Sequence, residues 1–169
     1  AMARLVHPNV VGVHAVGELN ELPYLVMDYI PGKDLSQLLR ATIRVGAPWD
    51  VETAIHVVRE VGQGLLYAHS YEQPDGTPLQ IVHRDVASKN VMIDGTGSVR
   101  LMDFGVATSL STMTSRIHVK GTLPYMAPEH YLGQAATASD VFGLGAIFWE
   151  MLAGRKFRAE LEGQELIAK

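Results

Sequence analysis

The chain has 169 residues, which is enough for one domain with a sizeable hydrophobic core. Apolar residues make up 47% and charged residues 19%, an ordinary globular balance, and the absence of cysteine excludes disulfides and thiolate metal sites. The net charge of -4 argues against a nucleic-acid partner, and the longest apolar run, 141–149, is too short to span a bilayer. We therefore expect a cytoplasmic domain with no membrane segment within this chain.

Two strands and two helices are predicted in the first half of the chain. The β-branched residues that follow a His-Pro-Asn turn predict a strand at 10–16, and the run 24–29, which ends before Pro-Gly, predicts a second strand. Leucines at helical spacing predict a short helix capped by Asp34. A longer apolar repeat at helical spacing predicts a helix that begins at Asp50 and ends near His69.

A hairpin and a long apolar helix are predicted in the second half. The stretches 91–93 and 99–102 have strand composition and are joined by an Asp-Gly-Thr-Gly-Ser turn. The hydroxyl-rich stretch 108–115 has no clear period, which indicates a mobile loop. A final helix is predicted to be capped by Ser139 and stopped by Gly154. Because it leaves almost no polar face, we expect this helix in the middle of the core.

Three motifs carry the chemistry of the sequence. The first is H-R-D-V-A-S-K-N at 83–90, the second is D-F-G at 103–105 and the third is A-P-E at 127–129. They match the catalytic loop, the metal-binding motif and the end of the activation segment of protein kinases. Any one tripeptide is weak support, but all three in this order, with a predicted hairpin between the first two, are specific. The sequence therefore resembles the catalytic domain of a eukaryotic-type protein kinase.

Phosphoryl transfer gives a chemical reason for this spacing. The reaction needs a carboxylate to accept the proton of the acceptor hydroxyl, and oxygen ligands that hold Mg²⁺ on the phosphates of ATP. Asp85 would be the base, Asn90 would reach a second Mg²⁺ from the same loop, and Asp103 would bind the Mg²⁺ that bridges the β- and γ-phosphates. Taken alone, Asp85 would more readily be a turn aspartate in a polar loop, and 103–105 a turn after a strand; taken together, the motifs favour the catalytic interpretation.

The resemblance covers essentially the whole chain and implies a truncated two-lobe protein-kinase fold of the α+β class. Residues 1–30 would be a remnant of the N-terminal lobe, with two strands of its sheet and the hinge. Residues 31–169 would form the mostly helical C-terminal lobe as far as its long central helix. In the family, the aspartate found here as Asp140 begins that helix and holds the backbone of the catalytic loop.

The same resemblance implies a nucleotide site around the hinge. Met27 would be the gatekeeper, the backbones of Asp28 and Ile30 would bond adenine, and Asp34 would hold the ribose. Plain core packing is the alternative for Met27, and a helix cap is the alternative for Asp34. The resemblance also implies two apolar stacks. The stack that adenine completes would consist of Leu35, Met92, Ile147 and Met151. The stack that links the two lobes would consist of Met2, Val13, His83 and Phe104.

Three further residues have expected roles in catalysis or its control. In the family, the arginine found here as Arg84 pairs with a phosphorylated activation loop, because a guanidinium can bind phosphate through two hydrogen bonds. A polar loop without phosphorylation is an equal alternative for the hydroxyls at 108–115. The usual lysine two residues after the base is Ala87 here, and Lys89 carries the positive charge instead, as is common in tyrosine kinases. The segment 121–129 nevertheless resembles the serine/threonine form, with Thr122 placed to bond the base.

Other family features are absent from the sequence. There is no G-x-G-x-x-G loop, no V-A-I-K lysine and no preceding helix glutamate, so we expect a fragment that is inactive and folds poorly by itself. In the family Glu129 pairs with an arginine beyond this segment, a role that Arg155 or Arg158 could take. A polar segment before the first motif, at 72–79, resembles bacterial members.

The sequence therefore predicts a bacterial-type serine/threonine kinase that uses ATP and Mg²⁺ on protein substrates. One alternative is a pseudokinase-like module that only binds partners, which would not need Asp85, Asn90 and Asp103. The other is a small-molecule kinase, which would not need the peptide shelf at 121–129.

Overall fold

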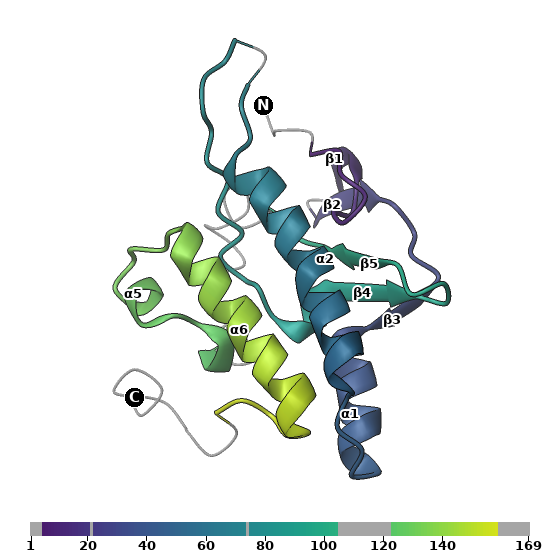
Figure 1. The fold of residues 1–169 in the computed structure, drawn as a ribbon. Helices are drawn as coiled ribbons and strands as arrows, with labels where there is room; N and C mark the ends of the chain where they lie inside the picture. Colours follow the sequence, from purple (N-terminus) through teal and green to yellow (C-terminus); the bar gives the residue numbers. More distant parts are fainter. Residues whose placement is uncertain (1–4, 21, 74, 105–122, 159–169) are drawn as a thin grey trace.

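A computed structural model describes residues 5–20, 22–73, 75–104 and 123–158 (Figure 1). In chain order the elements are β1 (Val13–Leu19), β2 (Leu22–Met27), β3 (Gly32–Asp34), α1 (Leu35–Arg44), α2 (Val51–His69), the short 3-10 helix η1 (Ser88–Asn90), β4 (Val91–Asp94), β5 (Val99–Leu101), the 3-10 helix η2 (Leu123–Tyr125), α5 (Pro128–Tyr131) and α6 (Thr137–Ala153). The predictions that concern Met2, the stretch 108–115 and Thr122 lie outside the described residues.

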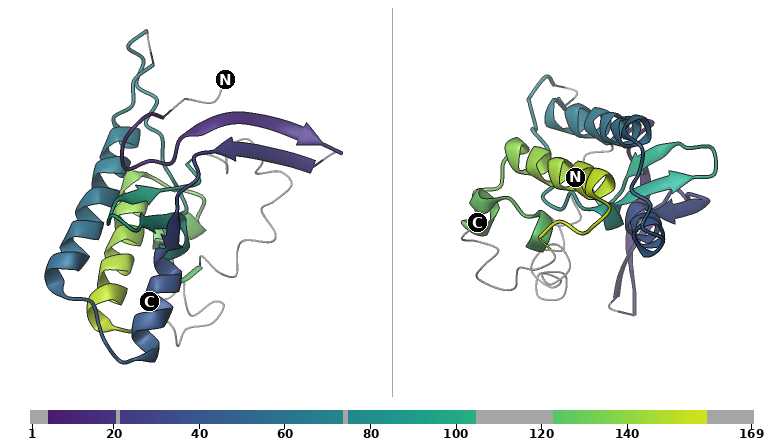
Figure 2. Two further views of the ribbon diagram at one scale, coloured as in Figure 1. Left: turned by 90° about the vertical axis from the view of Figure 1, so that its right-hand side faces the viewer. Right: turned by 60° about the horizontal axis from the view of Figure 1, so that its bottom comes forward.

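Two small antiparallel sheets lie beside the helices, as expected for the α+β class. β1 and β2 form a hairpin that extends away from the helical part of the molecule, while β3, β4 and β5 form a separate three-stranded sheet with β4 in the centre (Figure 2). In the second sheet Met92 on β4 lies opposite both Asp34 on β3 and Arg100 on β5. This register places the end of the hinge segment directly beside the strand that follows the catalytic loop.

The first predicted strand begins later than the sequence indicated. Residues 9–11 do not join the hairpin, because the Val11 N–H donates to the Leu101 carbonyl at 2.9 Å and the Leu101 N–H donates to the Asn9 carbonyl at 2.8 Å. β1 therefore begins at Val13, after the chain has left β5. A local pattern of β-branched residues cannot distinguish pairing with β2 from pairing with β5, since both place the backbone in an extended conformation.

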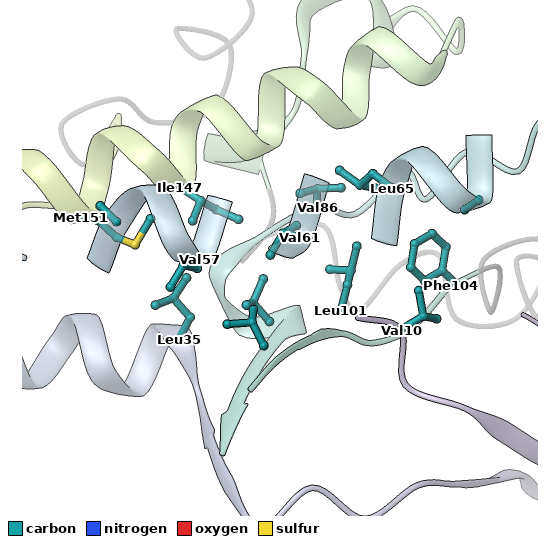
Figure 3. Packing of buried hydrophobic residues seen from close by; sticks show 14 of the residues in the cluster. Val10, Leu35, Val57, Val61, Leu65, Val86, Leu101, Phe104, Ile147 and Met151 are labelled. Atoms are coloured by element: carbon teal, nitrogen blue, oxygen red, sulfur yellow. The ribbon is translucent and has the colours of Figure 1, made fainter. Parts of the chain in front are cut away.

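The core lies between α2, α6 and the β3–β4–β5 sheet. Figure 3 shows Val57, Val61 and Leu65 of α2 facing Ile147 and Met151 of α6, and all five side chains are at most 3% exposed. Burial of an aliphatic side chain of this size contributes about 1.5–3 kcal/mol to stability. This helix pair forms the buried core beside which the loops of the site lie.

The last helix lies in the core on one side only, among the residues the structure describes. Ile147 and Met151 are fully buried against α2, but on the opposite side Val141 is 59% exposed and Trp149 is 37% exposed. In the part of the chain that is described, α6 is therefore buried on one side and exposed on the other. Its sequence, by contrast, is apolar around most of its circumference. No described helix has the length and apolar character needed to cross a membrane.

The ends of the helices confirm the cap predicted at Asp34 and the helix start predicted at Asp50, and they correct the cap predicted at Ser139. Asp34 and Asp50 accept hydrogen bonds from the backbone N–H groups of the first turns of α1 and α2, at 2.9 and 2.8 Å. α6, however, begins at Thr137, so Ser139 lies in its first turn and is not the cap. The Ser139 hydroxyl instead accepts the Ala136 N–H at 3.1 Å. Gly154 ends the helix with φ of 61°, a left-handed conformation that favours glycine.

We predict that Ile147→Ala lowers the free energy of unfolding by about 2–5 kcal/mol, because it leaves a cavity in the α2–α6 interface. The matched control is Ile55→Ala on α2, whose side chain is 53% exposed and whose loss should cost under about 1 kcal/mol. Urea denaturation of both variants measures the difference. Equal destabilisation would contradict the assignment of the core.

Candidate active site

A buried carboxylate holds the catalytic loop in its conformation. Asp140, which is 1% exposed, accepts the backbone N–H groups of His83 and Arg84 at 2.8 Å each. Its Oδ2 atom also lies 2.8 Å from Nε2 of His69, at the end of α2. Arg84 has φ of 69°, a left-handed conformation that costs a non-glycine residue about 1–3 kcal/mol and persists only where the surroundings enforce it. The role expected for Asp140 from the family resemblance is confirmed by these bonds.

The loop brings Asp85, Lys89 and Asn90 together. Oδ2 of Asp85 lies 3.1 Å from the Lys89 ammonium and accepts a 3.0 Å hydrogen bond from the Asn90 amide, which also donates to the Asp85 carbonyl at 2.7 Å. Oδ1 of Asp85 is buried and has no hydrogen-bond partner among the described residues. A buried oxygen of this kind costs about 1–3 kcal/mol. The carboxylate is therefore fixed through Oδ2, while Oδ1 accepts no hydrogen bond from the described residues.

His83 connects the catalytic loop to the D-F-G segment. Its ring is 1% exposed, with Nε2 2.8 Å from the Met102 carbonyl and Nδ1 3.2 Å from the N–H of Asp85. Because a carbonyl only accepts and an N–H only donates, Nε2 must carry the ring proton and Nδ1 must be bare. Burial lowers the pKa of His83, which favours this neutral form. The ring also packs edge-on against Phe104 with centroids 4.6 Å apart.

The two predicted metal ligands lie on adjacent segments. The Met102 N–H donates to the Asn90 carbonyl at 2.8 Å, which tethers the segment that carries Asp103 to the catalytic loop. Because the Asn90 amide nitrogen donates to Asp85, its side-chain oxygen is left to accept. Among the described residues no three His, Cys, Asp or Glu side chains form a metal site by themselves. An amide oxygen and a carboxylate do suit Mg²⁺, which commonly takes one or two protein ligands and completes its shell with phosphates and water.

The hinge has backbone groups that no described residue bonds. It follows Met27, the last residue of β2. The Asp28 N–H donates to the Gly12 carbonyl at 2.9 Å, and the Ile30 carbonyl accepts the Gly32 N–H at 2.8 Å. No described residue bonds the remaining Asp28 carbonyl or the remaining Ile30 N–H. An acceptor and a donor two residues apart match the amino group and ring nitrogen along one edge of adenine.

Asp34 and Met92 lie opposite each other in the β3–β4 ladder, and both α1 and β3 contact η1. Oδ1 of Asp34 already accepts from the Gln37 N–H and from the Ser36 hydroxyl. The helix-cap alternative for Asp34 is therefore correct for this oxygen, and only Oδ2 remains for another donor. Asp34 and Met92, which were predicted to bind the nucleotide, thus lie next to the catalytic loop. One carboxylate oxygen of Asp34 already accepts hydrogen bonds within the protein.

The sequence did not predict the contacts that hold the hinge in place. The Asp28 carboxylate lies 2.7 Å from Nε2 of His14, accepts the Gly12 N–H at 3.1 Å, and lies 3.7 Å from the Arg100 guanidinium. The bond from His14 is the main cause of the lowered pKa of Asp28, followed by the bond from Gly12. A Cβ atom on residue 12 would approach Oδ2 of Asp28 to 2.9 Å, so a larger residue there would displace this carboxylate.

The expected arginine partner of Glu129 is not found among the described residues. Glu129 instead accepts the Ser139 hydroxyl at 2.6 Å, which joins α5 to the first turn of α6. Arg155 and Arg158 lie over aromatic rings, at 5.1–5.3 Å from the ring centroids. The Arg84 side chain is exposed, and its predicted phosphorylated partner falls within the stretch that the structure does not describe.

Four polar residues were missed by sequence reasoning. His69 contacts Asp140, and the side chains of Ser88, Tyr125 and Glu150 are linked by hydrogen bonds. Glu150 alone gave a signal, because an acid near the end of a helix that is otherwise apolar needs a buried partner. The other three could not be recognised, since their partners are 25 to 71 residues away in the sequence.

Comparison with known proteins shows the family of this chain. The family model of the protein kinase domain matches residues 1–169. The chain is 34% identical to the serine/threonine-protein kinase PrkC of Bacillus subtilis, over 88% of the chain and 22% of that relative. It is 35% identical to the probable serine/threonine-protein kinase PknB of Lactococcus lactis, over 92% of the chain and 23% of that relative. The tyrosine-protein kinase MasK of Myxococcus xanthus is 34% identical over 89% of the chain and 24% of its own length.

The chain therefore belongs to the protein kinase domain family, as the motifs predicted. It spans less than a quarter of the length of these three relatives.

We predict that Asp140→Asn lowers the free energy of unfolding by about 1–3 kcal/mol or more, because an amide NH₂ would then face a backbone N–H or a histidine N–H. The same exchange at Asp50 is the control, since asparagine caps a helix about as well as aspartate and the cost should stay within about 0.5 kcal/mol. Urea denaturation gives both values. Amide hydrogen exchange at His83 and Arg84 should accelerate in the first variant alone; unchanged exchange there would contradict the anchoring role.

Proposed function

We propose that this chain is part of the catalytic domain of a serine/threonine protein kinase, which transfers the γ-phosphoryl group of ATP to serine and threonine hydroxyls of protein substrates in the cytoplasm. In this assignment residues 1–30 contribute the hinge side of the smaller lobe, and residues 31–169 contribute the larger lobe. The main support is the buried Oδ1 of Asp85, which has no partner among the described residues and lies beside Lys89 and Asn90. A module that only binds partners has no need of such an oxygen.

Asp85 acts as the base for the acceptor hydroxyl. Its Oδ2 is held by Lys89 and Asn90, so Oδ1 is left to accept a hydrogen bond from the hydroxyl and then its proton. The Lys89 cation stabilises negative charge that develops on the transferred group. Asn90 and Asp103 hold Mg²⁺, which when bound neutralises charge on the phosphates. Positioning and electrostatics of this kind are the main contributions of a protein to phosphoryl transfer.

The nucleotide lies along the hinge in this proposal. The Asp28 carbonyl accepts from the adenine amino group, and the Ile30 N–H donates to the ring nitrogen. Met27 closes the back of the adenine site, Met92 packs beneath the ring, and Oδ2 of Asp34 receives a ribose hydroxyl. The support is the pair of unused backbone groups on the hinge and the position of Asp34 opposite Met92.

Two further roles concern the acceptor and the activation segment. Thr122 bonds the base, as the serine/threonine form of segment 121–129 suggests, and Arg84 binds a phosphorylated hydroxyl of the activation segment. PrkC and PknB are named serine/threonine-protein kinases, and MasK is named a tyrosine-protein kinase. The segment 121–129 favours serine and threonine as acceptors here.

We predict that Asp85→Asn in the full-length protein lowers phosphotransfer by about 10²–10⁴-fold, the usual contribution of a general base. Binding of Mg·ATP should be retained, because Asp85 contacts the acceptor and not the metal. The measurements are radiolabelled phosphate transfer from ATP to a basic protein, and nucleotide binding by calorimetry.

The paired variant is Asp103→Asn, which makes the same chemical change on the metal side of the site. It should weaken Mg·ATP binding as well as transfer. If the two variants lose nucleotide binding equally, the division of roles between base and metal ligand is wrong.

We also predict that Lys89→Ala lowers the rate of transfer by about 10²-fold, since it removes a charge that stabilises the transferred group. Phospho-amino-acid analysis of the products should show phosphoserine and phosphothreonine. Full activity of the Lys89 variant would remove this residue from the catalytic group, and phosphotyrosine alone would overturn the acceptor assignment.

A further inference from the structure

A chain of partly buried hydrogen bonds joins the catalytic loop to the segment that precedes α5 and to the core helix α6. The Ser88 hydroxyl lies 2.8 Å from the Tyr125 hydroxyl, which donates to Oε2 of Glu150 at 2.6 Å. Oε1 of Glu150 accepts the Phe157 N–H at 2.9 Å. Ser88 is 3% exposed and Glu150 is 2% exposed, so water does not compete effectively for these groups.

The chemistry of the groups sets the direction of this chain. Both oxygens of Glu150 accept, one from a backbone N–H and one from the phenol, so the phenol proton points toward Glu150. Burial raises the pKa of Tyr125, and the phenol therefore keeps its proton. Ser88 must then donate to the phenol oxygen, since the only proton of that oxygen is already used. With Glu150 accepting, each hydroxyl has one role: Tyr125 donates to Glu150 and Ser88 donates to Tyr125.

The position of Ser88 gives this chain a consequence for the site. Ser88 lies in η1, between Asp85 and Asn90, and the loop is short and largely buried there. Tyr125 ends η2 and lies two residues before the A-P-E motif. The bond between the two hydroxyls is therefore a direct link between the loop that holds the base and the segment 123–127.

We propose that Ser88 is a positioning residue, whose hydroxyl uses Tyr125 and Glu150 to couple the conformation of segment 123–127 to the placement of Asp85. This inference rests on the proposed kinase function, in which segment 121–129 receives the protein substrate. Contact of the substrate with this segment is thereby transmitted to the position of the base. The coupling acts on transfer to the protein acceptor and leaves the hinge, where ATP binds, unaffected.

The kinetic test uses Ser88→Ala, Tyr125→Phe and the double variant of the full-length protein, with ATP and a basic protein as substrates. Loss of one neutral hydrogen bond corresponds to roughly a 3- to 10-fold effect. We expect Ser88→Ala to lower kcat by that factor without changing the KM for ATP. Because the two hydroxyls act through one bond, the double variant should lose less than the product of the single losses. The control is Ser98→Ala in the turn between β4 and β5, which should keep the original kcat.

Three results would overturn the inference: unchanged kcat in Ser88→Ala, fully multiplicative losses in the double variant, or a parallel rise in the KM for ATP. A separate measurement does not depend on catalysis. In Tyr125→Phe, amide hydrogen exchange across 85–90 should accelerate, although the substitution lies 35 or more residues away in sequence. Exchange that is unchanged there refutes the coupling, whether or not the protein transfers phosphate. Accelerated exchange in a protein that transfers no phosphate supports the coupling and refutes the proposed function.

Discussion

The Asp140 carboxylate is buried at the start of α6, and the arrangement of the site depends on the bonds that it accepts there. Removing a charge from water is costly, and it is tolerated only where hydrogen bonds satisfy the charge. Two backbone N–H groups of the catalytic loop and the His69 ring supply these bonds. These bonds also hold the loop in the left-handed conformation that it has at Arg84. In this conformation Asp85 lies beside Lys89 and Asn90.

The same anchoring explains how a site made largely of loops can be rigid. The histidine that meets Asp140 ends α2, and Asp140 itself lies in the first turn of α6, so the loop is fixed to both helices of the core (Figure 1). His83 then extends the anchoring to Met102 and Phe104. Groups that are held before the substrate arrives need not be ordered during the reaction, which is how positioning lowers a barrier.

Much of this site was predictable from short motifs, because the residues that meet in it are close in sequence. Asp85, Lys89 and Asn90 belong to one loop, and Asp34 and Asp50 cap helices that begin directly after them. Other features depend on distant partners. The start of β1 is set by bonds to Leu101, and the partners of Tyr125 and Glu150 cannot be recognised from local patterns. The one-sided burial of α6 also depends on what packs against it, and its composition does not reveal that.

The β1–β2 hairpin extends away from the helical part of the molecule and adjoins it at one end only (Figure 2). A rotation about that end would therefore displace the other end most. With seven residues in β1 and a rise of about 3.3 Å per residue, its arm is roughly 20 Å long. A rotation of about 10° at the hinge would move the tip, near Leu19, by about 3–4 Å, while the backbone of Ile30 at the pivot would hardly move. The contacts of the Asp28 carboxylate with Gly12, His14 and Arg100 lie at the base of this hairpin. A rotation there is magnified into a displacement at the far end of the hairpin that a distance probe could read.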